Sequence, residues 1–472
     1  MPYRIMLPIP PRVTSPRHWL LGPAYYAQRD PLRVIPQWIR ECGDIFTITS
    51  PLGKAAVVAT PELAHQVLVA RSARYQKKSR AYAVLRLLLG NGLVTSEGEF
   101  WRGQRKLVQP AFHRRRLDAL FGMMVERVTD CIERLALDAS GTVPVDMTPI
   151  LSHLTLDIIA RAMFSSDVAG SAADVSRHIA ILNQYALRLL RQPWLFLLPR
   201  GIPTPFNGAQ VRSFRGLNRI VADIIQARRK EPGAHDDLLA MLLSAVEEGT
   251  GRGMTDEQLR DEVMTIFVAG HETTANAMAW LLHLVSQNSA IEERLLEEID
   301  AHWPAGGLTL ESLGAFPYVR QVIEESLRIY PSIWSIGRQC TKEDELGGYR
   351  IPVGMNVVVP IFYFHWSERY WDEPGEFEPS RFAPRHRPSA EPLIYFPFGA
   401  GPRSCIGNHF ALQELMILTI LLHRNYQFLS VPGFRVEPDP LITLRPRYGM
   451  QLQVRPRSEH RTSPQESEPR GN

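Results

Sequence analysis

Apolar residues recur along most of this chain at spacings of three and four, which is the period of an amphipathic helix. The clearest case lies near the C-terminal end, where Ala411, Leu415, Leu418 and Leu422 fall at i, i+4, i+7 and i+11. A long helix is also expected from Thr255, where a hydroxyl residue precedes two acids. Further helices are expected over residues 31–41, 61–69, 100–110, 117–137, 147–164, 175–191 and 317–330, with another ending at the basic run 228–230. Residues 81–89 form an apolar run that breaks at Gly90. The pattern predicts a mainly helical fold.

Short runs with strand character interrupt the helices. Residues 45–49 and 55–59 flank a Pro-Gly turn and predict a strand pair, and residues 332–338 and 357–359 predict further strands. A small β-rich lobe is therefore expected beside the helical body.

One stretch without a clear period, residues 193–206, is apolar and proline-rich. It suits a packed connecting loop and an apolar entrance for a substrate equally well.

Composition places the chain among ordinary globular proteins. It has 472 residues, of which 45% are hydrophobic and 22% charged, with a net charge of +4 from 53 basic and 49 acidic residues. Such a balance implies no general attraction to nucleic acid. We expect a proline-rich segment over residues 1–30, one domain over 31–457 and a polar, disordered tail over 458–472.

Targeting signals and cysteine usage bear on location. No run of about 18 apolar residues predicts a transmembrane span, and no apolar stretch near the N-terminus predicts a signal peptide. Cys42, Cys131, Cys340 and Cys405 are scattered and form no Cys-x-x-Cys pair. This distribution disfavours a zinc site and favours a reducing compartment, so a cytoplasmic location is expected.

The strongest chemical signal surrounds Cys405. Glycines on both sides of it allow positive φ and close approach to a flat ligand, and a helix is expected directly after it. A helix N-terminus favours a thiolate, which could be an axial ligand of haem iron. A lone cysteine beside a tight turn would more often be structural. Here the surrounding residues also stand at fixed offsets, namely Phe398, Gly401, Arg403, Cys405 and Gly407.

That stretch resembles the haem-binding signature of the cytochrome P450 family, Phe-x-x-Gly-x-Arg-x-Cys-x-Gly. The resemblance implies a mainly α fold of the α+β type, in which haem b lies between the helices containing Thr273 and Phe410. Cys405 would be the iron ligand, and Arg403 would pair with a haem propionate.

Two further segments match the family at positions that contact the propionates. Trp101 and Arg105 lie at i, i+4 on one expected helix face and match Trp-x-x-x-Arg. Alone, such a pair is most often a surface contact between a ring and a cation. Arg338 corresponds to a position that often reaches a propionate.

The centre of the long helix reads Ala269-Gly270-His271-Glu272-Thr273-Thr274. Helical geometry places the small residues Ala269 and Gly270 on one face with Thr273, whose hydroxyl can bond to the Ala269 carbonyl. A crossing point of two helices would have the same pattern. The stretch resembles the family's oxygen-activation motif, which implies that Glu272 delivers protons through water and that Thr273 directs them.

A third resemblance is structural. Glu325 and Arg328 form Glu-x-x-Arg, and Arg381 lies in a downstream Phe-x-Pro-x-Arg-Phe stretch. In the family these three residues make a buried triad that supports the haem side of the fold.

The resemblance covers residues 31–455 and implies O2-dependent monooxygenation of an organic substrate. Electrons would come from a ferredoxin or flavodoxin and its NAD(P)H-dependent reductase, docking on the basic residues Arg102, Lys106, Arg114 and Arg115. A haem-thiolate peroxygenase or rearrangement enzyme, or a haem sensor, remains an alternative, although Glu272 and Thr273 favour the monooxygenase.

The expected substrate is apolar, such as a fatty acid, a terpenoid or a steroid-like molecule. The residues expected to contact it are Leu93, Val94, Ile266, Ala269, Ile333 and Ile336.

Overall fold

The computed structural model describes residues 7–14, 22–50, 53–138, 141, 143–164, 172–192, 207–230, 237–246, 251, 253–386 and 392–457. The apolar segment 193–206 and the expected tail 458–472 lie outside the described residues, as does part of segment 1–30.

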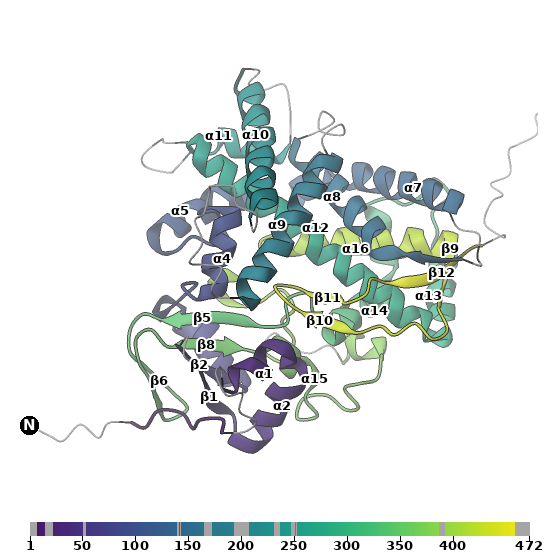
Figure 1. The fold of residues 1–472 in the computed structure, drawn as a ribbon. Helices are drawn as coiled ribbons and strands as arrows, with labels where there is room; N and C mark the ends of the chain where they lie inside the picture. The colour runs from purple at the N-terminus through teal and green to yellow at the C-terminus, as the bar shows by residue number, and fades with distance from the viewer. Residues whose placement is uncertain are drawn as a thin grey trace, which may run out of the picture.

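A helical body makes up most of the described chain, and a smaller β-rich lobe lies at its side (Figure 1). The helices of the body are α4 (Arg80–Leu89), α5 (Gly98–Val108), α6 (Arg114–Asp118), α7 (Phe121–Asp138), α8 (Met147–Phe164), α9 (Ala172–Arg191), α10 (Gly208–Lys230), α11 (Leu238–Ser244), α12 (Asp256–Ser286), α13 (Ser289–Ala301), α14 (Pro317–Ile329) and α16 (Asn408–Asn425).

The long helix α12 runs through the centre of the body and contacts α8, α10, α14 and α16. Its start is fixed by a capping box, in which Thr255 and Gln258 each bond to the other's backbone N–H. Most of its residues are buried, and one of them, Trp280, stacks on Tyr330 with ring centroids 3.9 Å apart. Burial on nearly every side identifies α12 as the core of the body.

The β-rich lobe is built on a five-stranded sheet in the order β1-β2-β8-β5-β3. These strands are β1 (Ile45–Ser50), β2 (Gly53–Val58), β3 (Tyr75–Gln76), β5 (Ile336–Cys340) and β8 (Asn356–Val359). The β1–β2 pair and the β5–β8 pair are antiparallel, whereas β2 and β8 are parallel. The helices α1 (Ala24–Arg29), α2 (Pro31–Cys42) and α15 (Ile361–Trp366) lie beside this sheet (Figure 1).

The described part of the N-terminal segment joins this lobe. Thr47 donates its N–H to the carbonyl of Pro11, and Val13 donates its N–H to Thr47. Arg350 likewise donates its backbone N–H to Pro8. Residues 8–13 thus contact β1 and the lobe directly.

Smaller sheets complete the fold. β4 (Pro144–Asp146), β12 (Gln451–Pro456) and β9 (Tyr426–Ser430) form one, β10 (Pro438–Pro440) pairs with β11 (Leu444–Pro446), and β6 (Asp344–Leu346) pairs with β7 (Tyr349–Ile351). The β4-β12-β9 sheet connects the chain's end to α8, since Met147 donates its N–H to Met450.

Most of the expected helices are present, with shifted ends that have local causes. The stretch expected as one helix over 117–137 is divided between the end of α6 and α7. The helix expected over 100–110 ends at Val108, because Pro110 begins a tighter 3₁₀ turn. The helix expected over 61–69 changes from α to π geometry at Gln66. The strand expected over 332–338 begins only at Ile336, and its first residues lead in from α14.

The acid and two arginines of the expected triad lie together. Both nitrogens of Arg328 that face Glu325 donate to its carboxylate at 2.7 Å, and both side chains are fully buried. Arg381 lies 3.4 Å from the same carboxylate. Arg328 also donates to the carbonyls of His365, Pro374 and Glu376, so this buried charge holds the loop after α15 against α14.

None of the helices in the described part of the chain is both long and apolar enough to cross a membrane.

Candidate active site

The loop containing Cys405 leads directly into α16. Its backbone is closed by bonds from Cys405 N–H to Phe398 and from Ser404 N–H to Gly401, at 2.9 and 3.0 Å. Gly401 has a φ of +69°, and a Cβ there would lie 2.1 Å from the carbonyl oxygen of Leu68. Only glycine can occupy this position without moving the backbone around Leu68.

Cys405 lies three residues before the start of α16, as expected, and its side chain is exposed. Burial of the surrounding loop nevertheless raises the pKa of its thiol, while the N–H of Gly407 and the cations Arg105 and Lys77 oppose this rise. The backbone N–H near the start of α16 thus favours the thiolate, as expected for a helix N-terminus, but burial has the larger effect on the pKa. A cation bound to the sulfur would be required to hold it ionised.

Arg403 contacts two parts of the chain beside the cysteine. Its guanidinium lies over the ring of Trp101, 3.6 Å from the centroid, and it donates to the Ser96 carbonyl at 3.0 Å and to Glu97 at 2.6 Å. Arg105, one turn after Trp101 on α5, donates to the carbonyl of Ser404 at 2.9 Å. The i, i+4 pair predicted on α5 therefore does face the cysteine loop.

Further cations come from distant parts of the chain. Arg338 on β5 donates to the Tyr82 hydroxyl at 3.2 Å, and Lys77 donates its ammonium to the Val94 carbonyl at 3.0 Å. Lys77 is buried, and its pKa is held well below its usual value, first by burial and then by Arg338 and Arg403. Four cations gather at this place, namely Lys77, Arg105, Arg338 and Arg403. The carboxylate of Glu97 opposes the lowering of the Lys77 pKa.

Such an excess of partly buried positive charge fits a ligand with carboxylate groups. Together with the exposed sulfur of Cys405, the cluster has the donor and the counter-charges that a haem with two propionates requires.

The surface of α12 opens at one place in its middle. Ala269 is exposed although the helix around it is mostly buried, and the hydroxyl of Thr273 donates to the Ala269 carbonyl at 2.7 Å. Ser332 in turn donates to the carbonyl of Thr273 at 2.8 Å. The predicted hydroxyl and small residue thus share the one exposed stretch that interrupts this buried part of α12.

Gly270 lies at a close crossing of two helices, the alternative that the sequence pattern left open. A Cβ on Gly270 would lie 3.2 Å from the side chain of Ile159 on α8, so the glycine permits a close helix crossing. His271 lies away from the open stretch, because it is buried and its carbonyl accepts a bond from Thr155 of α8.

Glu272 is tied to the C-terminal part of the chain. Its carboxylate accepts a bond from the Thr443 hydroxyl at 2.8 Å, and Thr443 accepts one from the amide of Asn276 at 3.3 Å. Thr443 lies just before β11, and no motif in the sequence pointed to it.

The six expected substrate contacts come from both lobes. Leu93, Val94, Ile266 and Ala269 lie in the helical body, whereas Ile333 and Ile336 pack with the β-rich lobe. Ile336 is close to the cysteine loop, since a Cβ on Gly399 would lie 3.5 Å from it.

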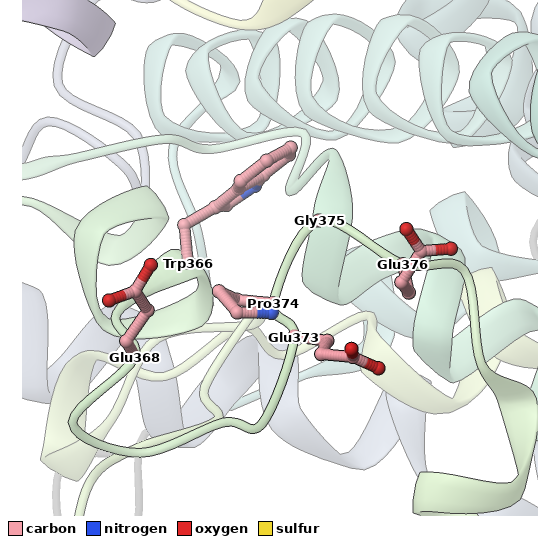
Figure 2. A pocket seen from close by; sticks show the side chains of 6 residues that line it. All are labelled: Trp366, Glu368, Glu373, Pro374, Gly375 and Glu376. Carbon is pink, nitrogen blue, oxygen red and sulfur yellow. The ribbon is translucent and has the colours of Figure 1, made fainter.

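A surface depression elsewhere contains none of these residues. It measures roughly 400 Å³ and is lined by Trp366, Pro374, Gly375 and three acids, Glu368, Glu373 and Glu376 (Figure 2). Its backbone is the loop whose carbonyls cap Arg328, so its shape follows from the triad.

Comparison with known proteins agrees with this site. The family model for cytochrome P450 matches residues 11–454. The chain belongs to the cytochrome P450 family. It is 32% identical over 412 residues to "Putative cytochrome P450 132" of Mycobacterium bovis, which covers 84% of this chain and 86% of the relative. It is also 32% identical over 415 residues to the "Cyclooctat-9-en-7-ol 5-monooxygenase" of Streptomyces melanosporofaciens, covering 88% of each.

Solved structures lead to the same conclusion. The haem domain of cytochrome P450DA superposes with a TM-score of 0.86 at 25% identity, covering 96% of this chain and 99% of that one. Retinoic acid-bound cyanobacterial CYP120A1 superposes with a TM-score of 0.82 at 26% identity, covering 96% and 100%. The fold expected from the sequence is thereby confirmed, and the protein is a haem-dependent P450 monooxygenase that needs O2 and redox partners.

Sequence reasoning missed several residues of this P450 site. Lys77, Tyr82 and Glu97 join the cation cluster, and Ser332 and Thr443 bond to the Glu272–Thr273 segment. Each is a single polar residue outside a motif, and its role depends on contacts made across the fold.

Proposed function

We propose that this P450 oxygenates a compact apolar substrate of the terpenoid class by hydroxylation or epoxidation. The observation that carries the proposal is the exposed Ala269 on α12 beside Thr273, whose carbonyl accepts a bond from Ser332, the neighbour of the apolar Ile333. Two relatives support the choice of class. The relative from Streptomyces melanosporofaciens is named for cyclooctat-9-en-7-ol, a cyclic alkenol. The solved structure of CYP120A1 contains retinoic acid. Fatty acids and steroid-like molecules are the competing classes.

Haem b would be the cofactor, and Cys405 would supply the thiolate that binds its iron. Its propionates would be held by the cations Lys77, Arg105, Arg338 and Arg403. The ring of Trp101 lies against the Arg403 guanidinium and would keep it in place. Phe398, Gly401 and Gly407 shape the loop so that the sulfur can approach a flat ring. When bound, the haem supplies the oxygen-activating chemistry.

The protein's part in the reaction is to place protons. Thr273 lies at the open stretch of α12, where its hydroxyl can pass a proton towards the haem face. Glu272 is the adjacent carboxylate, and its bond to Thr443 fixes where it exchanges protons with water. Leu93, Val94, Ile266, Ile333 and Ile336 exclude water and orient the substrate.

Electrons come from a ferredoxin or flavodoxin served by an NAD(P)H-dependent reductase. Four exposed cations lie on α5 and α6, namely Arg102, Lys106, Arg114 and Arg115. Helix α5 also contacts the cysteine loop through Arg105. A positive surface of this kind suits an acidic partner. Cys42, Cys131 and Cys340 form no disulfide, which fits a cytoplasmic location.

Two spectroscopic experiments test the proposal. The reduced protein with carbon monoxide should show the thiolate-haem absorption band, and Cys405→Ala should lose it. A panel of terpenoids, fatty acids and steroids is then titrated into the ferric protein, and the shift of the Soret band from low-spin to high-spin is measured. Terpenoids should give the largest shifts at the lowest concentrations. Tighter binding by fatty acids or steroids would overturn the substrate class, and an unchanged spectrum in Cys405→Ala would overturn the ligand.

A further inference from the structure

Two consecutive acids on α12 hold the loop that precedes α5. Asp261 accepts a bond from the N–H of Asn91 at 2.6 Å, and Glu262 accepts one from the N–H of Leu93 at 3.0 Å. This loop lies about 170 residues before α12 in the sequence. It contains two of the expected substrate contacts, Leu93 and Val94. The α12 acids therefore determine where these two residues lie.

The loop is shaped for this contact. A Cβ on Gly90 would lie 2.1 Å from the carboxylate of Asp261, and Gly90 has a φ of +63°. A Cβ on Gly92 would lie 2.2 Å from the hydroxyl of Thr265 and 2.5 Å from the carbonyl of Asp261. Both glycines are needed because the backbone runs directly against the helix.

The two acids differ in their charge partners. Asp261 forms an ion pair with Arg260, which also donates to Asn218 and lies over the ring of Phe214 on α10. Glu262 is 1% exposed, one of its carboxylate oxygens has no hydrogen-bond partner among the described residues, and the other bonds to Leu93. Burial, helped by Asp261, raises the pKa of Glu262 to about 7, and the Leu93 N–H opposes the rise.

The far end of the same loop is held by the cation cluster. Lys77 donates to the Val94 carbonyl, Arg403 donates to the Ser96 carbonyl, and both contact Glu97. Residues 90–97 are thus anchored at one end on α12 and at the other on the groups proposed to hold the haem propionates. Leu93 and Val94 lie between the two anchors.

We propose that Glu262 is a positioning residue that fixes Leu93 and Val94 beside the haem, and so controls the binding of bulky ligands there. This inference rests on the proposed function, because that function places Leu93 and Val94 among the residues that contact the substrate. Loss of the Glu262 acceptor releases the Leu93 N–H from α12, while the Asp261–Asn91 bond and the anchor at the cation cluster remain. Bulky ligands then lose their contacts with Leu93 and Val94, but the haem and its thiolate are unaffected.

The test compares two iron ligands in the haem-loaded protein at fixed pH. Imidazole needs little space, whereas 4-phenylimidazole places a ring against the surrounding side chains. Glu262→Met keeps the volume and removes the acceptor, Glu262→Gln keeps an acceptor, and Glu257→Ala is the control at an exposed acid of the same helix. We expect Glu262→Met to weaken 4-phenylimidazole about fivefold to tenfold, as for one lost hydrogen bond. Imidazole should change less than about twofold, and Glu262→Gln and Glu257→Ala should stay close to wild type.

Hydrogen exchange supplies a second readout. The amides of residues 91–95 should exchange faster in Glu262→Met than in wild type, and not in Glu262→Gln or Glu257→Ala. Equal weakening of both ligands, equal loss in the Gln and Met variants, or unchanged exchange would each overturn the inference.

A further variant protects the test against misfolding. Asp261→Asn weakens the neighbouring anchor and should give the same ligand selectivity to a smaller degree. If Glu262→Met does not fold, an Asp261→Asn variant that weakens both ligands equally overturns the inference.

If the wild type lacks the thiolate-haem band with carbon monoxide, the proposed function fails. If the wild type has the band and the Glu262 variants bind both ligands as it does, only the role of Glu262 fails.

Discussion

The hydroxyl of Thr443 donates a hydrogen bond of 2.8 Å to the carboxylate of Glu272. These residues lie 171 positions apart, and the bond joins the middle of α12 to the segment before β11. Asn276, one turn after Glu272, donates to Thr443 and completes the contact. The position of the acid beside Thr273 is therefore set by a part of the chain that carries no recognisable motif.

We predict that Thr443→Val slows turnover through Glu272. Valine keeps the shape of threonine but cannot donate, so the acid loses the partner that orients it. Turnover should fall about threefold to tenfold, less than the roughly 100- to 10,000-fold contributed by a group that itself transfers the proton. The carbon monoxide spectrum should not change. The measurement is the turnover rate of Thr443→Val, Glu272→Gln and the double variant. Additive losses in the double variant would show that Thr443 acts independently of Glu272.

We predict that Thr273→Ala diverts reducing equivalents to hydrogen peroxide. The hydroxyl of Thr273 is at the open stretch of α12, so its removal leaves proton delivery there to water alone. The variant should keep the haem spectrum and the substrate-induced shift, and form less product per NAD(P)H oxidised. Coupling is measured as product formed and peroxide released. Coupling equal to wild type would show that this hydroxyl serves only to pack the helix, and would favour a peroxide-dependent reaction.

The sequence allowed the fold and the cysteine loop to be predicted because both depend on local patterns. The period of Ala411 to Leu422 and the glycines around Cys405 act within one helix and one turn. The packing partner of Gly270 could not be predicted, because it is Ile159 of α8, and the helical period of α12 cannot identify a residue on another helix. Lys77 was missed for the same reason, since a single lysine becomes part of the site only when Arg338 and Arg403 are brought beside it.

We predict that Lys77→Met weakens haem binding. Its ammonium is buried among cations that lower its pKa, so a bound carboxylate would relieve this repulsion and gain a charged partner. Haem should leave the variant about tenfold faster than wild type, the loss typical of one charge-assisted hydrogen bond. The measurement is transfer of haem to an excess of apomyoglobin. Lys78→Met, at the exposed neighbouring lysine, is the control and should release haem at the wild-type rate. Equal rates in the two variants would remove Lys77 from the haem site.

We predict that the electron donor docks on the basic surface of α5 and α6. Arg114 and Arg115 are exposed, and reversing both to Glu should repel an acidic ferredoxin. First-electron transfer should slow about tenfold at low salt, and the difference should shrink as salt rises because exposed charges are screened. Arg212→Glu with Arg219→Glu makes the same charge change on the exposed face of α10 and serves as the control. Slowing of similar size in both double variants would indicate a general charge effect and contradict docking at α5 and α6.

We predict that His365 makes the fold less stable in acid. Its ring accepts the N–H of Phe396 at one nitrogen and lies 3.2 Å from the Arg328 carbonyl at the other, so the folded protein requires the neutral form. Burial, followed by the charge of Arg328, lowers the pKa of His365 from 6.5 to about 3.

Because the pKa is lower in the folded protein, neutral His365 stabilises the fold at pH values above the unfolded pKa of 6.5. This stabilisation is lost as the pH falls towards 3. Between pH 7 and pH 5 the loss should be about 2 kcal/mol, because the unfolded histidine binds a proton that the folded one excludes. His365→Phe cannot titrate, so the difference in unfolding free energy between wild type and this variant should shrink by that amount over the same range. A difference that stays constant from pH 7 to pH 5 would mean that His365 does not remain neutral in the folded protein.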